Sequence, residues 1–423
     1  MDNPHPNPVR RRFLKTAVLA VASIAGAAAA RQRLLFNPCL NPSNMPLAQS
    51  PWLAQVWQGL DPAQVWDCHT HLVGIGDSGR GPRVGEKLMN PRHPVLYVQR
   101  LFYMNAGVAA SEPGTVDEKY VRRLASLTRS MPPGVKAVLF AFDWYHGDNG
   151  QPVPDLSTFY VPNDYARQVA KECPDAFEWA ASIHPYRPDA VDQLEAAVAQ
   201  GARAVKWLPA AQNINPDSPK CDAFFAALAR LAIPLITHCG EEKAAQAASL
   251  THFGNPLHLR RALDAGVRVV VAHCASYGSD KDLDHPGTRR ASSFDLFARL
   301  MDRPEWRENL FGDISAITLR NRKPQVLKTL LERESWHRRL LNGSDYPLPG
   351  ILPLISLPRL VRHKLLPADA LPDLLTLRQH NALYFDLALK RMLNWQGHTF
   401  PAHVFETRAF FETLPHEAQP AAA

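Results

Sequence analysis

The strongest constraint on the fold is a regular alternation of short apolar runs, rich in Val, Ile and Leu, with stretches of helical periodicity. Helical patterns occupy, for example, 189–200, 221–231 and 255–265. The apolar runs predict strands at 65–71, 135–142, 177–184, 204–208, 234–238, 268–273, 310–315 and 340–345. Because strands that alternate with helices form parallel sheets, eight such units favour a closed (β/α)8 barrel over an open doubly wound sheet.

Every predicted strand ends in a polar, mostly ionisable residue. In chain order these are His69 with His71, Asp143, His184, Lys206, His238, His273, Asp313 or Ser315, and Asp345. The carboxyl ends of barrel strands meet at one mouth, where enzymes of this fold place their chemistry. We therefore expect these side chains to surround a single site.

Four short motifs carry the candidate metal-binding side chains. His69 and His71 are two residues apart, so on a strand their imidazoles point to the same side. The other motifs read ITHCG at 236–240, VAHC at 271–274 and NGSDYP at 342–347. In this order the motifs resemble the amidohydrolase superfamily, and within it the amidohydrolase-related branch that includes aminocarboxymuconate-semialdehyde decarboxylase. The resemblance covers residues 65–386 and includes NALYF at 381–385, which is similar to the last helix of that branch.

The resemblance implies a metal-dependent enzyme with a small-molecule substrate. By it, His69, His71, His238 and Asp345 bind one divalent ion, most often Zn²⁺, and His273 is the general acid or base. The chemistry agrees, because imidazole and carboxylate suit zinc, which lowers the pKa of bound water to about 7. Asp345 would then also accept a proton, which makes it catalytic as well as a ligand.

Lys206 leaves a second arrangement open. It lies where some members of the superfamily carry a carbamylated lysine that bridges two metal ions. In that case Lys206, His238 and His273 would hold a second ion. One ion is the expectation, because a lysine followed by proline three residues later often accompanies a mononuclear site in the related branch.

The remaining polar strand ends and the cysteines carry weaker predictions. Asp143 and His184 either line the substrate pocket or make structural hydrogen bonds. Cys68, Cys239 and Cys274 each adjoin a histidine. Strand alternation predicts that these thiols face the helix layer and pack as small apolar groups.

The substrate and the reaction depend on long loops. Residues 72–134 carry Arg80, Arg83, Arg92 and Arg100, and residues 276–293 are also rich in charge; either loop could bind a carboxylate, and both could be solvated surface. Hydrolysis of a C–N, ester or lactone bond is the first expectation. The alternatives are a zinc-dependent decarboxylase, which should need an arginine near the metal, and an inactive periplasmic metal- or ligand-binding barrel.

The N-terminal sequence indicates export. Three arginines at 10–12, the Phe-Leu-Lys that follows, an apolar stretch and an alanine run to residue 30 resemble a twin-arginine signal peptide. The apolar stretch is shorter than the roughly 20 residues of a membrane span, so cleavage is favoured over retention as an anchor. We expect the twin-arginine export machinery as a partner and a periplasmic location.

The domain boundaries follow from these assignments. Residues 1–30 are the signal, 31–64 an arm or linker, 65–393 the barrel and 394–423 a C-terminal tail. Aromatic residues in the tail predict docking on the body or on another subunit of a homo-oligomer.

The net charge of +7 does not indicate a nucleic-acid partner. Four of the basic residues lie in the signal, and the rest of the chain has no run of Lys or Arg.

Overall fold

The computed structural model describes residues 51–107, 114–242, 250–285, 287 and 289–412, and its centre is a barrel of eight parallel strands. All eight predicted strands are present, although most end earlier than the sequence pattern suggests. They are β1 (Trp66–His71), β3 (Lys136–Phe140), β5 (Phe177–Ala180), β6 (Val205–Trp207), β7 (Leu235–His238), β8 (Val269–Ala272), β11 (Leu310–Asp313) and β12 (Leu340–Leu341).

The strands form two curved sheets that join at both edges. One sheet has the order β1-β3-β5 and the other β12-β11-β8-β7-β6. A parallel bridge between Ala181 and Val205 joins β5 to β6, and a bridge between Thr70 and Tyr346 joins β1 to the segment after β12. The ring of eight strands is therefore closed, and the predicted (β/α)8 barrel is confirmed.

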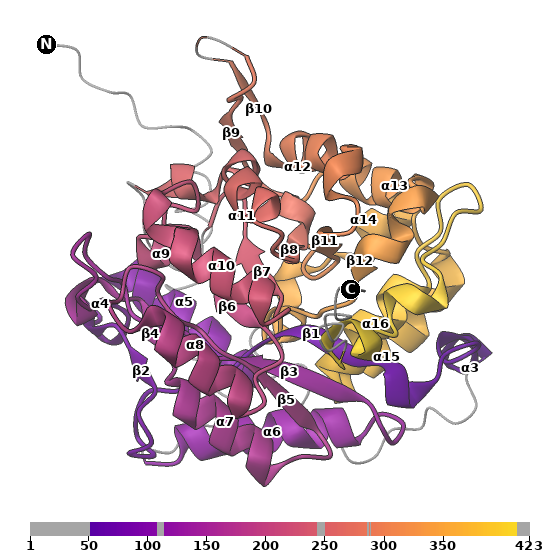
Figure 1. Ribbon diagram of the computed structural model, residues 1–423. Helices are drawn as coiled ribbons and strands as arrows, with labels where there is room; N and C mark the ends of the chain where they lie inside the picture. The colour runs from indigo at the N-terminus through magenta and orange to yellow at the C-terminus, as the bar shows by residue number, and fades with distance from the viewer. Residues whose placement is uncertain (1–50, 108–113, 243–249, 286, 288, 413–423) are drawn as a thin grey trace, which may run out of the picture.

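Helices surround this barrel (Figure 1). They are α3 (Pro51–Val56), α4 (Glu86–Met89), α5 (Pro94–Gly107), α6 (Val116–Arg129), α7 (Asn163–Glu172), α8 (Ala190–Ala199), α9 (Pro209–Gln212), α10 (Asp222–Arg230), α11 (Arg260–Asp264), α12 (Ser293–Met301), α13 (Pro324–Glu332), α14 (Leu357–Arg362), α15 (Leu371–His380), α16 (Ala382–Arg391) and α17 (Arg408–Glu412). Two antiparallel pairs lie outside the barrel: β2 (Arg83–Val84) with β4 (Phe159–Tyr160), and β9 (Ser279–Lys281) with β10 (Arg290–Ser292). The β9–β10 hairpin projects from the helical ring (Figure 1).

Strand alternation divides the apolar core into two layers. In β3, Val138 and Phe140 face the barrel interior, where they cluster with Ile236 and Val270. Leu139, between them, belongs to the larger cluster that lies between strands and helices. The parallel strands are thus buried on both faces, which explains why they read as continuous apolar runs.

The segments that flank the barrel pack on it. In the predicted arm, Leu53 and Val56 of α3 are buried, and Trp57 Nε1 donates to Tyr384 Oη at 2.7 Å. In the predicted tail, Phe411 stacks on Trp66 at 6.4 Å between ring centroids, within the interior cluster. The aromatic tail residues in this part of the chain therefore dock on the body of the same chain.

The predicted signal, 1–30, lies outside the described residues, as do residues 31–50 of the arm and 413–423 of the tail. Among the described residues, none of the helices has the length and apolarity needed to cross a membrane.

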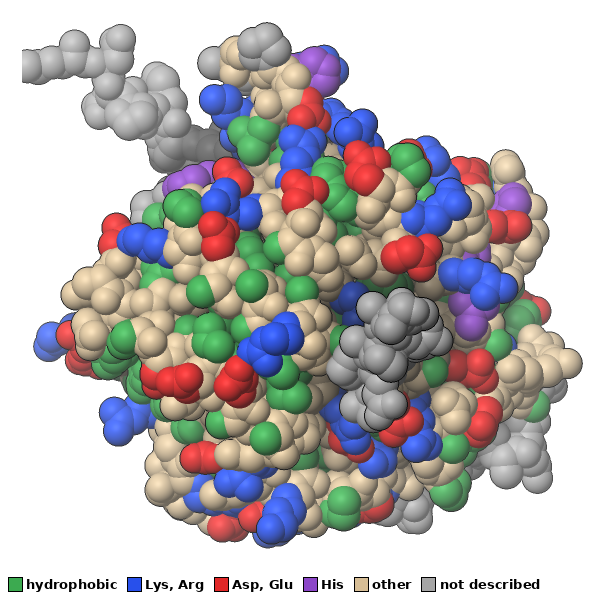
Figure 2. Space-filling view, viewed as in Figure 1, with side chains coloured by type: hydrophobic (Ala, Val, Ile, Leu, Met, Phe, Trp, Pro, Cys, Tyr) green, Lys and Arg blue, Asp and Glu red, His purple; other side chains and the backbone are tan. Residues whose placement is uncertain are grey.

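Charged side chains of both signs are mixed on the visible face of the molecule (Figure 2). Many are paired, as in the contact of Arg261 Nε with Asp222 Oδ1 at 2.6 Å and of Arg230 with Glu195. Such exposed pairs contribute little to stability, roughly 0.2–1 kcal/mol each.

Candidate active site

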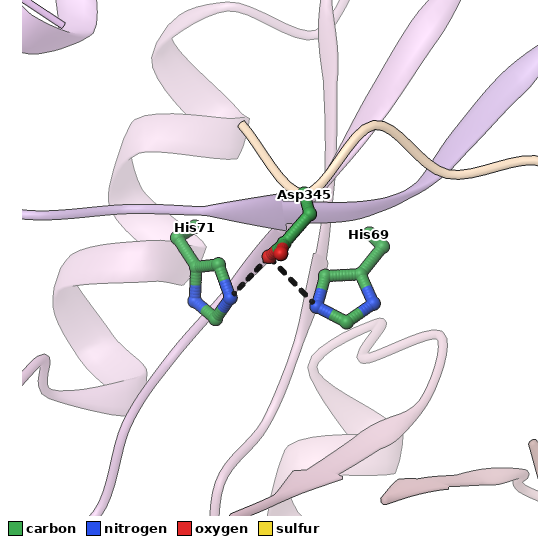
Figure 3. A group of neighbouring side chains, drawn as sticks. All are labelled: His69, His71 and Asp345. Atoms are coloured by element: carbon green, nitrogen blue, oxygen red, sulfur yellow. Dashed lines mark ion pairs between the residues drawn. The ribbon is translucent and has the colours of Figure 1, made fainter. Parts of the chain in front are cut away.

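Two histidines of the first strand and an aspartate that follows the last strand meet at the barrel mouth (Figure 3). Asp345 Oδ1 lies 3.0 Å from His71 Nε2 and 3.4 Å from His69 Nε2. Asp345 and His69 are buried, and 29% of the His71 side chain is exposed, so solvent reaches the group at His71. Asp345 has a left-handed backbone (φ 60°), an uncommon conformation for a residue other than glycine and one that clusters at functional sites.

The buried carboxylate of Asp313 fixes the tautomer of His69. The sequence had left open whether Asp313 or Ser315 is the polar residue at this strand end. His69 Nδ1 lies 2.8 Å from Asp313 Oδ2. Since a carboxylate only accepts, Nδ1 carries the proton and the Nε2 lone pair points to Asp345. Such carboxylate–histidine pairs orient metal ligands in many proteins.

His273 is oriented as a base. Its Nδ1 lies 3.2 Å from the carbonyl oxygen of Ser315 and 2.7 Å from Ser315 Oγ, which itself donates to Asp313. Nδ1 therefore donates, and the lone pair on Nε2 faces Asp345 Oδ2 at 3.8 Å. Burial, reinforced by the nearby His69, lowers the pKa of His273 well below its ordinary value, so the ring is neutral at pH 7.

The backbone turns sharply where β8 ends. Residues 273, 274 and 275 all have positive φ, between 48° and 56°, although none is glycine. This left-handed turn lies at the point where the chain places the His273 ring in the mouth. A local sequence pattern does not reveal it, because Ala-His-Cys-Ala has no turn-forming residue.

His238 lies beside this group. Its ring centroid is 5.3 Å from that of His273, and Nδ1 lies 3.4 Å from Glu242 Oε2. Its Nε2 is buried without a hydrogen-bond partner among the described residues. Burial, chiefly, lowers the pKa of His238. Because Nδ1 faces the Glu242 carboxylate, which only accepts, the neutral ring carries its proton on Nδ1 and its lone pair on Nε2.

The assembled groups fit a divalent cation. Imidazole nitrogens and a carboxylate suit zinc and its neighbours among the transition metals. His69, His71 and Asp345 offer ligand atoms within 4.8 Å of one another, and the same holds for His69, His273 and Asp313. The unpartnered Nε2 of His238 is a further nitrogen beside them.

Lys206 reaches the same place from β6. Its side chain is 1% exposed, with Nζ 3.3 Å from His69 Nε2 and 4.7 Å from the ring centroid of Phe140. Burial lowers the pKa of Lys206, which favours the neutral amine that carbamylation requires. The predicted bridge to a second metal stays a prediction.

Asp143 and His184, predicted as weak candidates for the substrate pocket, bond to the protein itself. Asp143 accepts from the backbone N–H of His184 at 2.8 Å and from that of Trp144 at 2.8 Å. His184 Nε2 donates to the Gln212 carbonyl at 2.9 Å, and Nδ1 accepts from the Tyr186 N–H at 3.2 Å. Both ring nitrogens of His184 therefore make hydrogen bonds within the protein. Of the two roles left open by the sequence, pocket lining and structural hydrogen bonding, these contacts match the second.

The prediction that all three cysteines face the helix layer is wrong for Cys68. Cys239 and Cys274 lie in the outer cluster, but Cys68 lies inside the barrel. The register between β1 and β3 shifts between Asp67 and Thr70, so β1 contains one extra residue at a bulge. This bulge lets Cys68 and the two histidines that follow it lie on the same side of the sheet.

A second buried carboxylate joins the first strand to the last. Asp67 accepts from the Ser344 N–H at 2.8 Å and from the His69 N–H at 3.1 Å. Behind it, Lys390 Nζ donates to the Gly343 carbonyl at 2.6 Å and to Asp386 Oδ2 at 2.5 Å. These bonds set the position of Asp345 relative to His69.

One buried arginine of this region was not predicted from the sequence. Arg322 lies on the segment that continues from Ser315, with its guanidinium carbon 5.0 Å from the centroid of the Tyr277 ring. Burial lowers the pKa of Arg322, while Asp345 and Glu242 oppose the shift. By contrast Arg80, from the loop proposed to bind a carboxylate, pairs with Glu172 at 2.7 Å.

The sequence matches the family model described as Amidohydrolase over residues 66–353, which is more than half of the chain. The chain belongs to the amidohydrolase family. Members of this amidohydrolase-2 branch are metal-dependent enzymes, and the resemblance stated from the sequence motifs is confirmed. A search of curated proteins gives no match.

Solved structures similar to this amidohydrolase share little of its sequence. An uncharacterized TIM-barrel protein from Bordetella bronchiseptica is 17% identical, with 68% of this chain and 88% of that chain covered and a TM-score of 0.45. A probable 2-pyrone-4,6-dicarboxylic acid hydrolase from Acinetobacter baumannii is 14% identical (76% and 99% covered, TM-score 0.41). A 5-carboxyvanillate decarboxylase from Novosphingobium aromaticivorans, with bound manganese, is 13% identical (84% and 99% covered, TM-score 0.45).

Proposed function

We propose that this amidohydrolase is a metal-dependent hydrolase that cleaves a C–N, ester or lactone bond of a small molecule. His273 Nε2 carries the proposal, because it is a bare imidazole nitrogen facing Asp345 beside the metal-binding histidines. His69, His71 and Asp345 would hold the ion, with His238 as fourth ligand and Zn²⁺ as the expected metal. When bound, the ion would polarise the scissile carbonyl and lower the pKa of a water molecule.

The residues of the chain supply proton transfer and orientation. His273 Nε2 and Asp345 Oδ2 lie on the same side of the site, and one of them accepts the proton of the attacking water. The water oxygen bonds to the carbonyl carbon, the C–N or C–O bond breaks, and the group that took the proton returns it to the leaving nitrogen or oxygen. Ser315 accepts the Nδ1–H of His273, which keeps Nε2 directed at Asp345.

Metal content tests the number of ions. We expect one ion per chain in the purified protein, and near zero or strongly weakened binding in His238→Ala. A ratio near two in the wild type, reduced to one in Lys206→Met, supports the carbamylated bridge instead. Elemental analysis of both variants, beside the wild type, distinguishes the two arrangements.

Decarboxylation is the second candidate, and Arg322 is the observation that favours it. Cleavage of a C–C bond to a carboxylate needs a cation that holds an acidic substrate, and a hydrolase has no such general need. The test follows substrate turned over in ¹⁸O-labelled water. Incorporation of the label into the organic product supports hydrolysis, and release of CO₂ without incorporation supports decarboxylation.

An inactive binding barrel is the remaining alternative. Metal-loaded protein that turns over none of a broad panel of amides, esters, lactones and aromatic acids would contradict the proposed enzyme.

Export by the twin-arginine route to the periplasm is likewise a proposal. Cell fractionation of the full chain, compared with a variant in which the three arginines at 10–12 are replaced by lysine, tests it: the variant should stay in the cytoplasm.

A further inference from the structure

Arg322 lies where three strand-end loops meet. It follows β11 on the segment that begins at Ser315, and it covers the ring of Tyr277, which follows β8. The carbonyl of Tyr277 accepts from the Glu241 N–H at 3.0 Å, so this ring also adjoins the loop after β7. Arg322 is only 9% exposed, and it follows the carboxyl end of β11, on the side of the barrel where the mouth lies.

The guanidinium of Arg322 has no hydrogen bond or ion pair within the described part of the chain, and its Nε is buried without a partner. Two other buried arginines differ in that their terminal guanidinium nitrogens donate hydrogen bonds. Arg378 donates to the carbonyls of Ile351 and Leu352 at 3.0 Å, and Arg339 donates to that of Met301 at 2.8 Å. An unpaired buried charge is costly, and the structural arginines of this protein avoid that cost.

The segment that carries Arg322 starts at the site, because it begins at Ser315, whose Oγ lies 2.7 Å from His273 Nδ1. Thr318, on the same segment, also has a buried hydroxyl without a partner among the described residues. A cation and a hydroxyl that are both unsatisfied at the mouth of a catalytic barrel can bind an oxyanion of the substrate.

We propose that Arg322, supported by the Tyr277 ring, binds a carboxylate of the substrate and so selects acidic substrates. The planar guanidinium matches a carboxylate with two parallel N–H···O bonds, and stacking on an aromatic face leaves its edge free. A neutral analogue would leave the buried cation unsatisfied. This inference rests on the proposed function for the site but concerns binding and not the reaction.

Binding of benzoate and benzamide to the full-length, metal-loaded protein tests it, because the two probes differ mainly in charge. Calorimetry should show benzoate bound about tenfold or more tightly than benzamide by the wild type. Arg322→Met should lose this preference, and Arg322→Lys should keep part of it. The control is Arg80→Met, which removes an arginine that also covers a tyrosine ring, that of Tyr165 at 5.1 Å, and should retain the preference.

Thermal unfolding distinguishes a role of Arg322 in substrate binding from a role in stabilising the fold. Removing an unpaired buried cation should leave the melting temperature of Arg322→Met equal to the wild type or above it. A marked fall in melting temperature, or an unchanged benzoate preference in Arg322→Met, overturns the proposal. Tighter binding of phenyl phosphate, with benzoate bound no better than benzamide, also overturns it. Loss of the preference in a protein without any turnover would leave this inference standing and count against the proposed enzyme alone.

Discussion

Asp313→Asn isolates the contribution of the carboxylate behind the proposed metal ligand. Asp313 Oδ2 faces His69 Nδ1 at 2.8 Å, while Oδ1 accepts from the backbone N–H groups of His273 at 2.9 Å and Ser315 at 3.0 Å. Asparagine keeps the volume but replaces one oxygen by NH₂, which is a donor. In either orientation the amide meets at least one buried donor with another donor, at a cost of about 1–3 kcal/mol.

The same change should weaken metal binding. If the amide NH₂ faces His69, the ring must move its proton to Nε2, and that nitrogen can no longer bind a cation. Loss of such supporting carboxylates typically costs about 10–100-fold in metal affinity, which is about 1.4–2.7 kcal/mol.

Competition with a chromophoric chelator measures the affinity, and urea unfolding measures the stability. Asp264→Asn is the control, since Asp264 is exposed and accepts from Trp306 Nε1 far from the site. Metal affinity of Asp313→Asn within twofold of the wild type would refute the reasoning, because His69 would then not depend on its carboxylate.

Three further predictions follow from separate parts of the structure. Gly343→Ala should lower stability by about 1–3 kcal/mol and weaken metal binding, because the new Cβ would lie 2.5 Å from His69 Cβ; Gly147→Ala, whose closest contact is a flexible side chain, should be near neutral in the same urea titration. Arg299 holds the pKa of Asp282 well below its ordinary value, so the stability that this pair contributes is present above about pH 4 and is lost as the pH falls toward the depressed pKa. The melting temperatures of Arg299→Met and wild type should therefore differ at pH 7, and the difference should shrink progressively as the pH falls below about 4. Removing the metal with a chelator should lower the unfolding free energy by about 2.7 kcal/mol relative to protein at a metal concentration of 100 Kd; an unchanged calorimetric melting temperature would count against a bound ion.

The sequence predicted the barrel because its strands are buried on both faces, so each appears as an apolar run. It predicted His69, His71 and Asp345 as neighbours because strand ends in a barrel converge. These three side chains do meet: Asp345 Oδ1 lies 3.0 Å from His71 Nε2 and 3.4 Å from His69 Nε2.

Other features depend on backbone irregularities that carry no sequence signal. Because of the bulge in β1, Cys68 faces the barrel interior and not, as had been predicted, the helix layer. The left-handed turn at 273–275 contains no turn-forming residue. Arg322 was missed because it lies beyond the last apolar residue of its strand. Its Nε lacks a hydrogen-bond partner among the described residues only as a result of the tertiary structure, which a sequence pattern does not reveal. The contacts of His184 likewise come from tertiary structure, with Gln212 as one partner.

The two ends of the barrel sequence meet where β1 lies beside the segment after β12. There, Asp67 and the Ser344 N–H are 277 residues apart in the chain, yet they are hydrogen-bonded. A chain that has folded every strand but the last would therefore lack Asp345 and could not hold the ion. Metal binding should then favour only the completed ring, so that metal supply during synthesis would affect the yield of native protein as well as its activity.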